Sequence, residues 1–225
     1  LPISLNIAGS EPRVVGGVSY SIPKERKPTP RQVMRDLAVL MHAATLTGEV
    51  VYLFTDDIKD YFNQLRLAAE EEWKSVVVTL AIPGDPGYDA ARPSLVYVNE
   101  RVLGFGTTRS SNYAQRLSNT LMDITRERAL EADRQISQSS RSPALRRGLH
   151  RRRALGEKTH SPEDKRFFNH CYTDDALFGA VGVEATISLL RTWRGVTAEA
   201  HLLMAIPKKR KIGTMVMWLG ILFYS

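Results

Sequence analysis

Cysteine is almost missing from this chain: Cys171 is the single cysteine among 225 residues. One cysteine excludes an internal disulfide framework and a cysteine-rich zinc site. Chains with this little cysteine fit a reducing compartment, so we expect an intracellular location, in the cytoplasm or the nucleus.

Long hydrophobic runs are missing as well. No apolar stretch approaches the roughly 20 residues that a membrane-spanning helix requires, so we expect no membrane partner. The first residues, Leu1-Pro2-Ile3, show neither an initiator methionine nor the charged-then-apolar order of a signal peptide. We interpret the chain as a piece of a longer polyprotein.

Positive charge exceeds negative charge. Lys and Arg total 31 against 24 Asp and Glu, which gives a formal net charge of +7. This excess favours a polyanionic partner such as nucleic acid, although many structural proteins are equally basic. The Ser- and Arg-rich residues 135–165 predict a flexible basic insertion, either a solvated linker or an arm that touches phosphates.

The alternation of predicted strands and helices suggests an α/β sandwich with helices on one face of a sheet, with residues 1–48 as an N-terminal segment and 49–225 as the main domain. A first helix begins at Pro30 behind a Thr29 cap. Helices are also expected after Gly106 and over 183–197. Strands are expected over 49–55, 74–80, 94–98 and 215–223, with a hairpin over 167–178. The residues expected to face inward from the helices include Met41, Leu117, Ile124, Ile187, Leu190 and Trp193.

Three aspartates stand at predicted strand ends: Asp57 after one apolar strand, and Asp174 with Asp175 between two others. A carboxylate at such a place loses hydration unless something compensates its charge. Mg²⁺ is the natural partner because hard divalent ions prefer oxygen ligands, with Mn²⁺ as a possible substitute. Paired ions about 3.5–4 Å apart are the known arrangement for phosphoryl transfer. Turn capping is the alternative role for these aspartates, and Asp56 competes with Asp57 as a ligand.

Four motifs follow one another in a fixed order: residues 54–65, Leu-Gly-Phe-Gly at 103–106, Tyr-Thr-Asp-Asp at 172–175, and residues 205–220 with Lys209 and Trp218. Together they resemble the reverse transcriptases of retroelements and retroviruses over roughly residues 50–223. Gly104 and Ser111 depart from the family, which usually has proline at both places. The resemblance implies an α+β fold, the palm of an RNA-directed DNA polymerase in which an antiparallel sheet is backed by helices, with partial fingers. Such a polymerase takes a template with its primer and dNTPs. It also implies a parent polyprotein with a thumb and possibly ribonuclease H or integrase regions.

The resemblance also implies roles for individual residues. Asp57, Asp174 and Asp175 match the family's catalytic metal ligands for two Mg²⁺ ions, and Lys209 matches its general acid, although the basic residues 208–211 suit a phosphate-binding patch nearly as well. The residues that match nucleotide contacts are Arg13, Ile58, Phe62, Phe105, Gly106 and Gln115. The residues that match primer contacts are Tyr172, Trp218, Leu219 and Gly220.

Alternative interpretations remain open. Phe62 matches the aromatic ring that excludes a ribose 2′-hydroxyl, but it also suits an ordinary core position, as does Trp218. A decayed palm that only binds nucleic acid would keep the same motifs. An RNA-dependent RNA polymerase usually has a polar residue in place of Phe62 and a Gly at the start of the Asp-Asp hairpin motif. A metal-dependent hydrolase is the most distant alternative.

Overall fold

The computed structural model describes most of the chain, and for 13–15, 18–20, 108–109 and 136 it describes the backbone alone. The described residues are 13–15, 18–20, 25–67, 69, 76–85, 87–99, 101–104, 108–136, 141–143, 146–147, 166–205 and 212–225. Most of the predicted basic insertion at 135–165 lies outside these residues.

The chain divides into two compact units. One unit comprises Leu1–Pro23 and Asp60–Asn112, and the other comprises Lys24–Lys59 and Tyr113–Ser225. This division differs from a boundary at residue 48, because the first helix belongs to the same unit as the main sheet.

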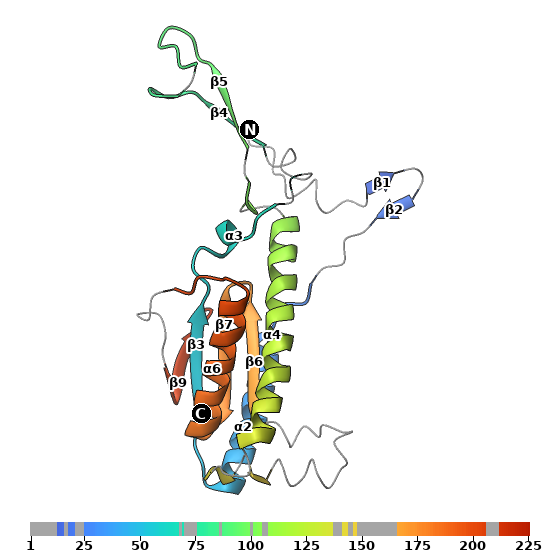
Figure 1. Cartoon of the computed structure of the whole chain (residues 1–225), viewed down its shortest axis with the longest axis vertical. Coiled ribbons are helices and arrows are strands. Elements are labelled where there is room, and N and C mark those ends of the chain that lie inside the picture. Colours follow the sequence, from blue (N-terminus) through green and yellow to red (C-terminus); the bar gives the residue numbers. More distant parts are fainter. Residues whose placement is uncertain are drawn as a thin grey trace. The chain divides into compact units, whose positions relative to one another are not determined.

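The larger unit is built on an antiparallel sheet with the strand order β6-β7-β3-β8 (Figure 1). Helices α2 and α6 pack on its strands, and the separate β9–β10 hairpin contributes residues to the hydrophobic core. The α+β prediction of an antiparallel sheet backed by helices is therefore confirmed. The elements of this unit are α2 (Pro30–Thr47), β3 (Val51–Asp57), most of α4 (Thr108–Ile136), β6 (Phe167–Tyr172), β7 (Asp175–Val181), α6 (Val183–Glu199), β8 (Ile212–Gly213), β9 (Met215–Trp218) and β10 (Ile221–Tyr224).

Helix α2 begins where the sequence predicts. The Thr29 hydroxyl accepts a hydrogen bond from the Gln32 amide, the Gln32 side chain accepts one from the Thr29 amide, and Pro30 occupies the first turn. This reciprocal capping satisfies amides that would otherwise lack partners at the start of a helix. The helix ends at Gly48, which adopts a left-handed conformation with φ of 67°.

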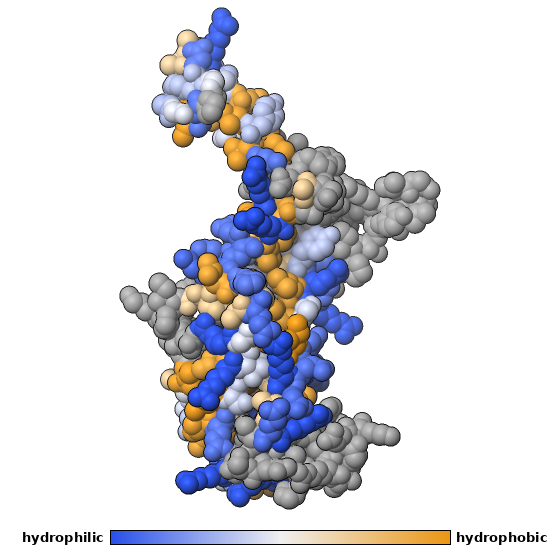
Figure 2. Space-filling model, viewed as in Figure 1, coloured by the Kyte–Doolittle hydropathy of each residue, from blue (hydrophilic) through white to orange (hydrophobic). Residues whose placement is uncertain are grey.

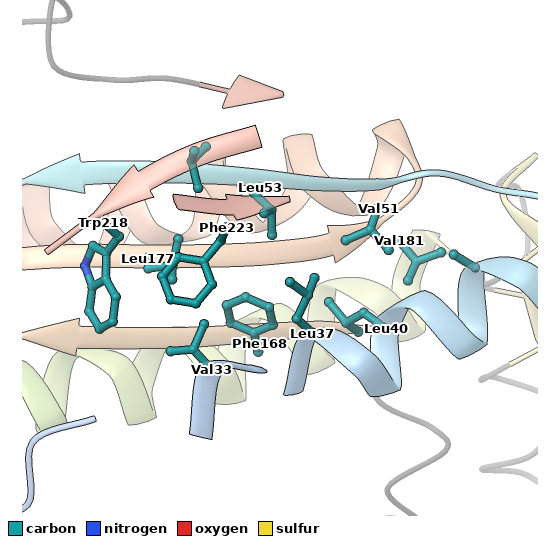
Figure 3. Packing of buried hydrophobic residues seen from close by; sticks show 12 residues of the cluster. Val33, Leu37, Leu40, Val51, Leu53, Phe168, Leu177, Val181, Trp218 and Phe223 are labelled. Atoms are coloured by element: carbon teal, nitrogen blue, oxygen red, sulfur yellow. The ribbon is translucent and has the colours of Figure 1, made fainter. Parts of the chain in front are cut away.

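One face of the sheet packs against α2 and the β9–β10 hairpin. In Figure 3, the Phe168 ring of β6 lies between Phe223 of β10 and Leu37 of α2, with Trp218 at one end of the cluster. The cluster comprises Val33, Leu37, Leu40, Ala44, Val51, Leu53, Phe168, Leu177, Val181, Val216, Trp218 and Phe223. Burial of this apolar surface stabilises the sheet on which the acidic residues stand.

The opposite face packs against α4 and α6, so helices cover both faces of the sheet rather than the single face that the alternation of elements suggested. Phe54 stacks on Phe178 with ring centroids 4.6 Å apart, and Trp193 of α6 lies 5.3 Å from Phe178. Trp193 was expected to face inward, and it does. Ile124 and Ile187 were also expected inward, but they are 38% and 43% exposed. The adjacent residues Thr125 and Thr186 are buried instead, so the buried stripe of each helix is displaced by one residue at these positions.

Two further corrections concern α2 and the C-terminal part of the chain. Met41 is exposed, and Ala44 takes the inward position one turn later. The predicted single strand over 215–223 is a hairpin, in which β9 and β10 pair antiparallel through a turn at Leu219 and Gly220. Both turn residues have positive φ, which ends the extended run that the apolar residues alone suggested.

The described residues of the smaller unit include the hairpin of β1 (Arg13–Val15) with β2 (Val18–Tyr20), the hairpin of β4 (Val76–Leu80) with β5 (Leu95–Asn99), and the short helix α3 (Tyr61–Gln64). The predicted strands over 74–80 and 94–98 are confirmed within a residue or two. Hydrophobic side chains lie exposed along the β4–β5 hairpin, at the upper end of the view in Figure 2.

Within the portion of the chain that the structure describes, no helix is both long and apolar enough to cross a membrane.

Candidate active site

The end of strand β3 brings two acidic residues together. β3 and β7 pair antiparallel, and their register places Asp57 directly opposite Asp175. Residues directly opposite each other point to the same face of a sheet, with Cβ atoms about 4.5–5.5 Å apart. Like charges so placed destabilise a sheet, so a pair of this kind is expected where a cation binds.

Asp174 lies in the turn between β6 and β7, next to Asp175. Its carbonyl accepts a hydrogen bond from the Ile58 amide at 3.2 Å, and the Asp57 carbonyl accepts one from Ala205 at 2.8 Å. The first bond ties the chain just after β3 to the turn and the second ties Asp57 to the segment before β8. With the pairing of Asp57 and Asp175, the backbones of all three predicted metal ligands meet at one end of the sheet. The Ile58 side chain is buried in the core, and its backbone amide is the group that contacts the turn.

Asp56 points to the other face of the sheet. It is buried, accepts a hydrogen bond from the indole of Trp193 at 3.2 Å, and forms an ion pair with Arg194 at 3.1 Å. Because side chains alternate along a strand, Asp56 and Asp57 cannot serve the same site. The role of Asp57 as the metal ligand stays a prediction.

The turn residue Thr173 adopts an uncommon backbone conformation with φ of 60°. This left-handed region is unfavourable for a β-branched residue, so neighbouring contacts must hold it. The Thr173 amide donates to the Gln115 side-chain oxygen at 2.8 Å. The Thr173 carbonyl accepts hydrogen bonds from the Ser118 hydroxyl and from the Cys171 thiol. Helix α4 thus fixes the turn that carries Asp174.

Gln115 is fully buried, with 0% of its surface exposed. Its amide nitrogen donates to the Cys171 carbonyl at 2.9 Å, so both ends of the carboxamide serve the β6–β7 hairpin. In the structure Gln115 therefore makes hydrogen bonds within the protein. Its contact with a nucleotide stays a prediction. Sequence reasoning missed Ser118, although a polar residue within a buried helical stripe is a signal that such a partner exists.

Cys171 lies buried beneath this turn. Burial raises the pKa of its thiol well above the ordinary value, and the charges of Asp174, Asp175 and Asp57 raise it further. The thiol therefore stays protonated at neutral pH, which suits its role as a hydrogen-bond donor to Thr173.

We expect Cys171 to resist thiol reagents in the folded protein, because the thiolate is the reactive form and this thiol is both buried and protonated. Dithionitrobenzoate should release little chromophore from native protein at pH 8 and one equivalent after denaturation. Rapid stoichiometric labelling without denaturant would show that the turn does not cover the sulfur.

The donor chemistry of the three aspartates fits Mg²⁺, and the strand register fits a shared site. The side chains themselves, however, do not converge on one point: among the residues described, no group of three or more His, Cys, Asp or Glu side chains is arranged to hold a metal ion. The backbone therefore brings the three aspartates to the same end of the sheet. Their carboxylates would still have to rotate before they could bind one ion together.

The predicted primer-contacting residues lie on two hairpins. Trp218 of β9 is 3% exposed and packs in the core, and its indole donates to the Asp175 carbonyl at 3.1 Å. The burial supports the alternative interpretation of Trp218 as a core-packing residue. The hydrogen bond links β9 to the β6–β7 hairpin that carries Asp174 and Asp175. Leu219 and Gly220 form the exposed β9–β10 turn, and Tyr172 is partly exposed beside Thr173.

The remaining predicted residues belong to the smaller unit or are not among the described residues. Phe62 stands on α3 in the smaller unit, where its ring contacts Tyr61 edge-on at a centroid distance of 6.2 Å. Arg13 stands on β1 in the same unit. Phe105, Gly106 and Lys209 lie outside the described residues. Their roles stay predictions.

No protein-family model matches the chain, and no curated protein matches its sequence. Among solved structures, the chain is similar to telomerase from Candida albicans in complex with a TWJ fragment of telomeric RNA, with 8% sequence identity and a TM-score of 0.47. The match covers 90% of this chain and 33% of the telomerase chain, so this chain spans about one third of that protein's length. A likeness this distant identifies neither a family nor an activity.

Proposed function

We propose that this chain is the palm of an RNA-directed DNA polymerase, which adds dNTPs to a primer 3′-hydroxyl on an RNA or DNA template. The observation that carries the proposal is the cross-strand pair of Asp57 and Asp175, with Asp174 in the adjoining turn. The order of the four sequence motifs and the net charge of +7 support it, since both suit a nucleic-acid polymerase.

In this proposal Asp57, Asp174 and Asp175 bind two Mg²⁺ ions. Bound there, the ions would lower the pKa of the primer hydroxyl and neutralise the triphosphate. The protein's own contribution is positional. Gln115 and Ser118 hold the Thr173 backbone, and Trp218 donates to the Asp175 carbonyl, so these side chains hold the backbone that carries the carboxylates. Phe62 and Lys209 would act on the sugar and on the leaving pyrophosphate.

Primer extension on a poly(rA)/oligo(dT) hybrid tests the proposal. We expect extension with dTTP and Mg²⁺, little extension with UTP, and none after chelation by EDTA, with recovery when Mg²⁺ or Mn²⁺ is restored. Preferential use of UTP would identify an RNA-dependent RNA polymerase instead. Well-folded protein that extends no primer under these conditions would contradict the proposed activity.

A palm that binds nucleic acid without catalysis is the second candidate. The observation that favours it is that no three-ligand metal group is preformed among the side chains the structure describes. This candidate predicts binding to a template–primer duplex that weakens steeply with salt, as phosphate contacts do, with no extension by the same preparation.

A further inference from the structure

Lys27 lies beside the turn that carries Asp174, although 146 positions separate it from Thr173. Its ammonium donates a hydrogen bond to the Thr173 hydroxyl at 3.2 Å. The same ammonium lies over the ring of Tyr172, 4.5 Å from the ring centre. One side chain therefore contacts both residues that precede Asp174.

The backbone around Lys27 is itself held against helix α4. The Glu25 carboxylate accepts a hydrogen bond from Arg116 at 2.8 Å and another from Asn119 at 3.2 Å. The bond from Arg116 is the largest cause that lowers the pKa of Glu25 below its ordinary value. Asn119 also donates to the Arg26 carbonyl at 3.4 Å and accepts from Gln115 at 2.9 Å. The segment before α2 and the Gln115 that holds the turn thus belong to one hydrogen-bond network.

Thr173 is bound on all of its polar groups. Its amide donates to Gln115 and its hydroxyl accepts from Lys27. Its carbonyl accepts from both Ser118 and Cys171. Lys27 supplies the charged contact among these four. A positive charge here both stabilises the left-handed turn and offsets repulsion among the nearby carboxylates, because opposite charges attract strongly in a partly buried setting.

We propose that Lys27 is a positioning residue for the polymerase reaction, which holds Tyr172 and Thr173 and thereby the backbone that carries Asp174 and Asp175. This inference rests on the proposed function. It assigns Lys27 no contact with substrate, since the Lys27 ammonium is directed at the side chains of Tyr172 and Thr173.

The experiment compares Lys27→Met, Lys27→Arg and the control Arg26→Met, which removes the same charge one residue earlier. In primer extension we expect Lys27→Met to lower kcat about ten-fold, the effect of losing one hydrogen bond from a charged donor, with the KM for dTTP and for template–primer nearly unchanged. Lys27→Arg should restore most of kcat, because guanidinium also donates a hydrogen bond and stacks on an aromatic ring. Arg26→Met should behave as wild type.

Hydrogen exchange of the peptide covering residues 171–175 provides a readout that does not depend on activity. Exchange should be faster in Lys27→Met than in wild type, Lys27→Arg or Arg26→Met, because the turn opens more often. Unchanged exchange in Lys27→Met would overturn the proposal, as would a raised template–primer KM with normal kcat, which indicates a phosphate contact. If wild type extends no primer while exchange responds as expected, the polymerase proposal fails and the role of Lys27 in the turn stands.

Discussion

Asp174→Asn should abolish primer extension, with a loss of about 1,000-fold or more in kcat, because a neutral amide removes charge from a site that must neutralise two divalent ions. Asp174 lies in the turn whose backbone is fixed by Gln115, Ser118 and Cys171, so the substitution changes the ligand without moving the chain. Single-nucleotide addition under saturating dTTP and Mg²⁺ measures the effect.

The matched control is Asp123→Asn, which removes one carboxylate from the exposed face of α4, where it forms an ion pair with Arg126 of the same helix. This variant should retain extension. Thermal unfolding should show Asp174→Asn to be at least as stable as wild type, since one like charge leaves the acidic end of the sheet. Near-normal extension by Asp174→Asn would remove Asp174 from catalysis and, with it, the metal arrangement proposed above.

Phe62→Val should admit ribonucleotides, raising the use of UTP relative to dTTP by about 100-fold. The expectation follows from a flat ring that leaves no room for a 2′-hydroxyl, whereas the smaller valine does. Phe62 is partly buried and packs edge-on against Tyr61, so shortening it also removes an aromatic contact within α3. The ratio of kcat/KM for the two nucleotides measures selectivity independently of any loss of folded protein.

Phe62→Tyr is the control, because it keeps the ring and should keep the preference for dTTP. If Phe62→Val shows the wild-type ratio, the residue is an ordinary packing aromatic. If both variants lose selectivity equally, the position matters for local folding rather than for the shape of the sugar site.

Local signals predicted many of the elements. The Thr29 cap, Pro30 in the first helical turn and the Tyr-Thr-Asp-Asp hairpin all appear where the sequence places them, because capping and turn formation depend on residues within a few positions of each other. Helix faces were predicted less well, as Ile124 and Ile187 show. An apolar residue at the edge of the apolar stripe fits the helical period whether it is buried or exposed. Only the element that packs against the helix decides which of the two it is.

Residues far apart in sequence required the folded chain. That Asp57 faces Asp175, while Asp56 faces Trp193, is a consequence of strand register, because a shift by one residue would exchange the two aspartates. No local sequence pattern around Lys27 predicts its contact with Thr173. The sequence by itself determined the acidic residues, their order and the elements that carry them. The tertiary structure alone decided which carboxylates share a face and which side chains hold their turn, since contacts between distant segments depend on packing that no local pattern encodes.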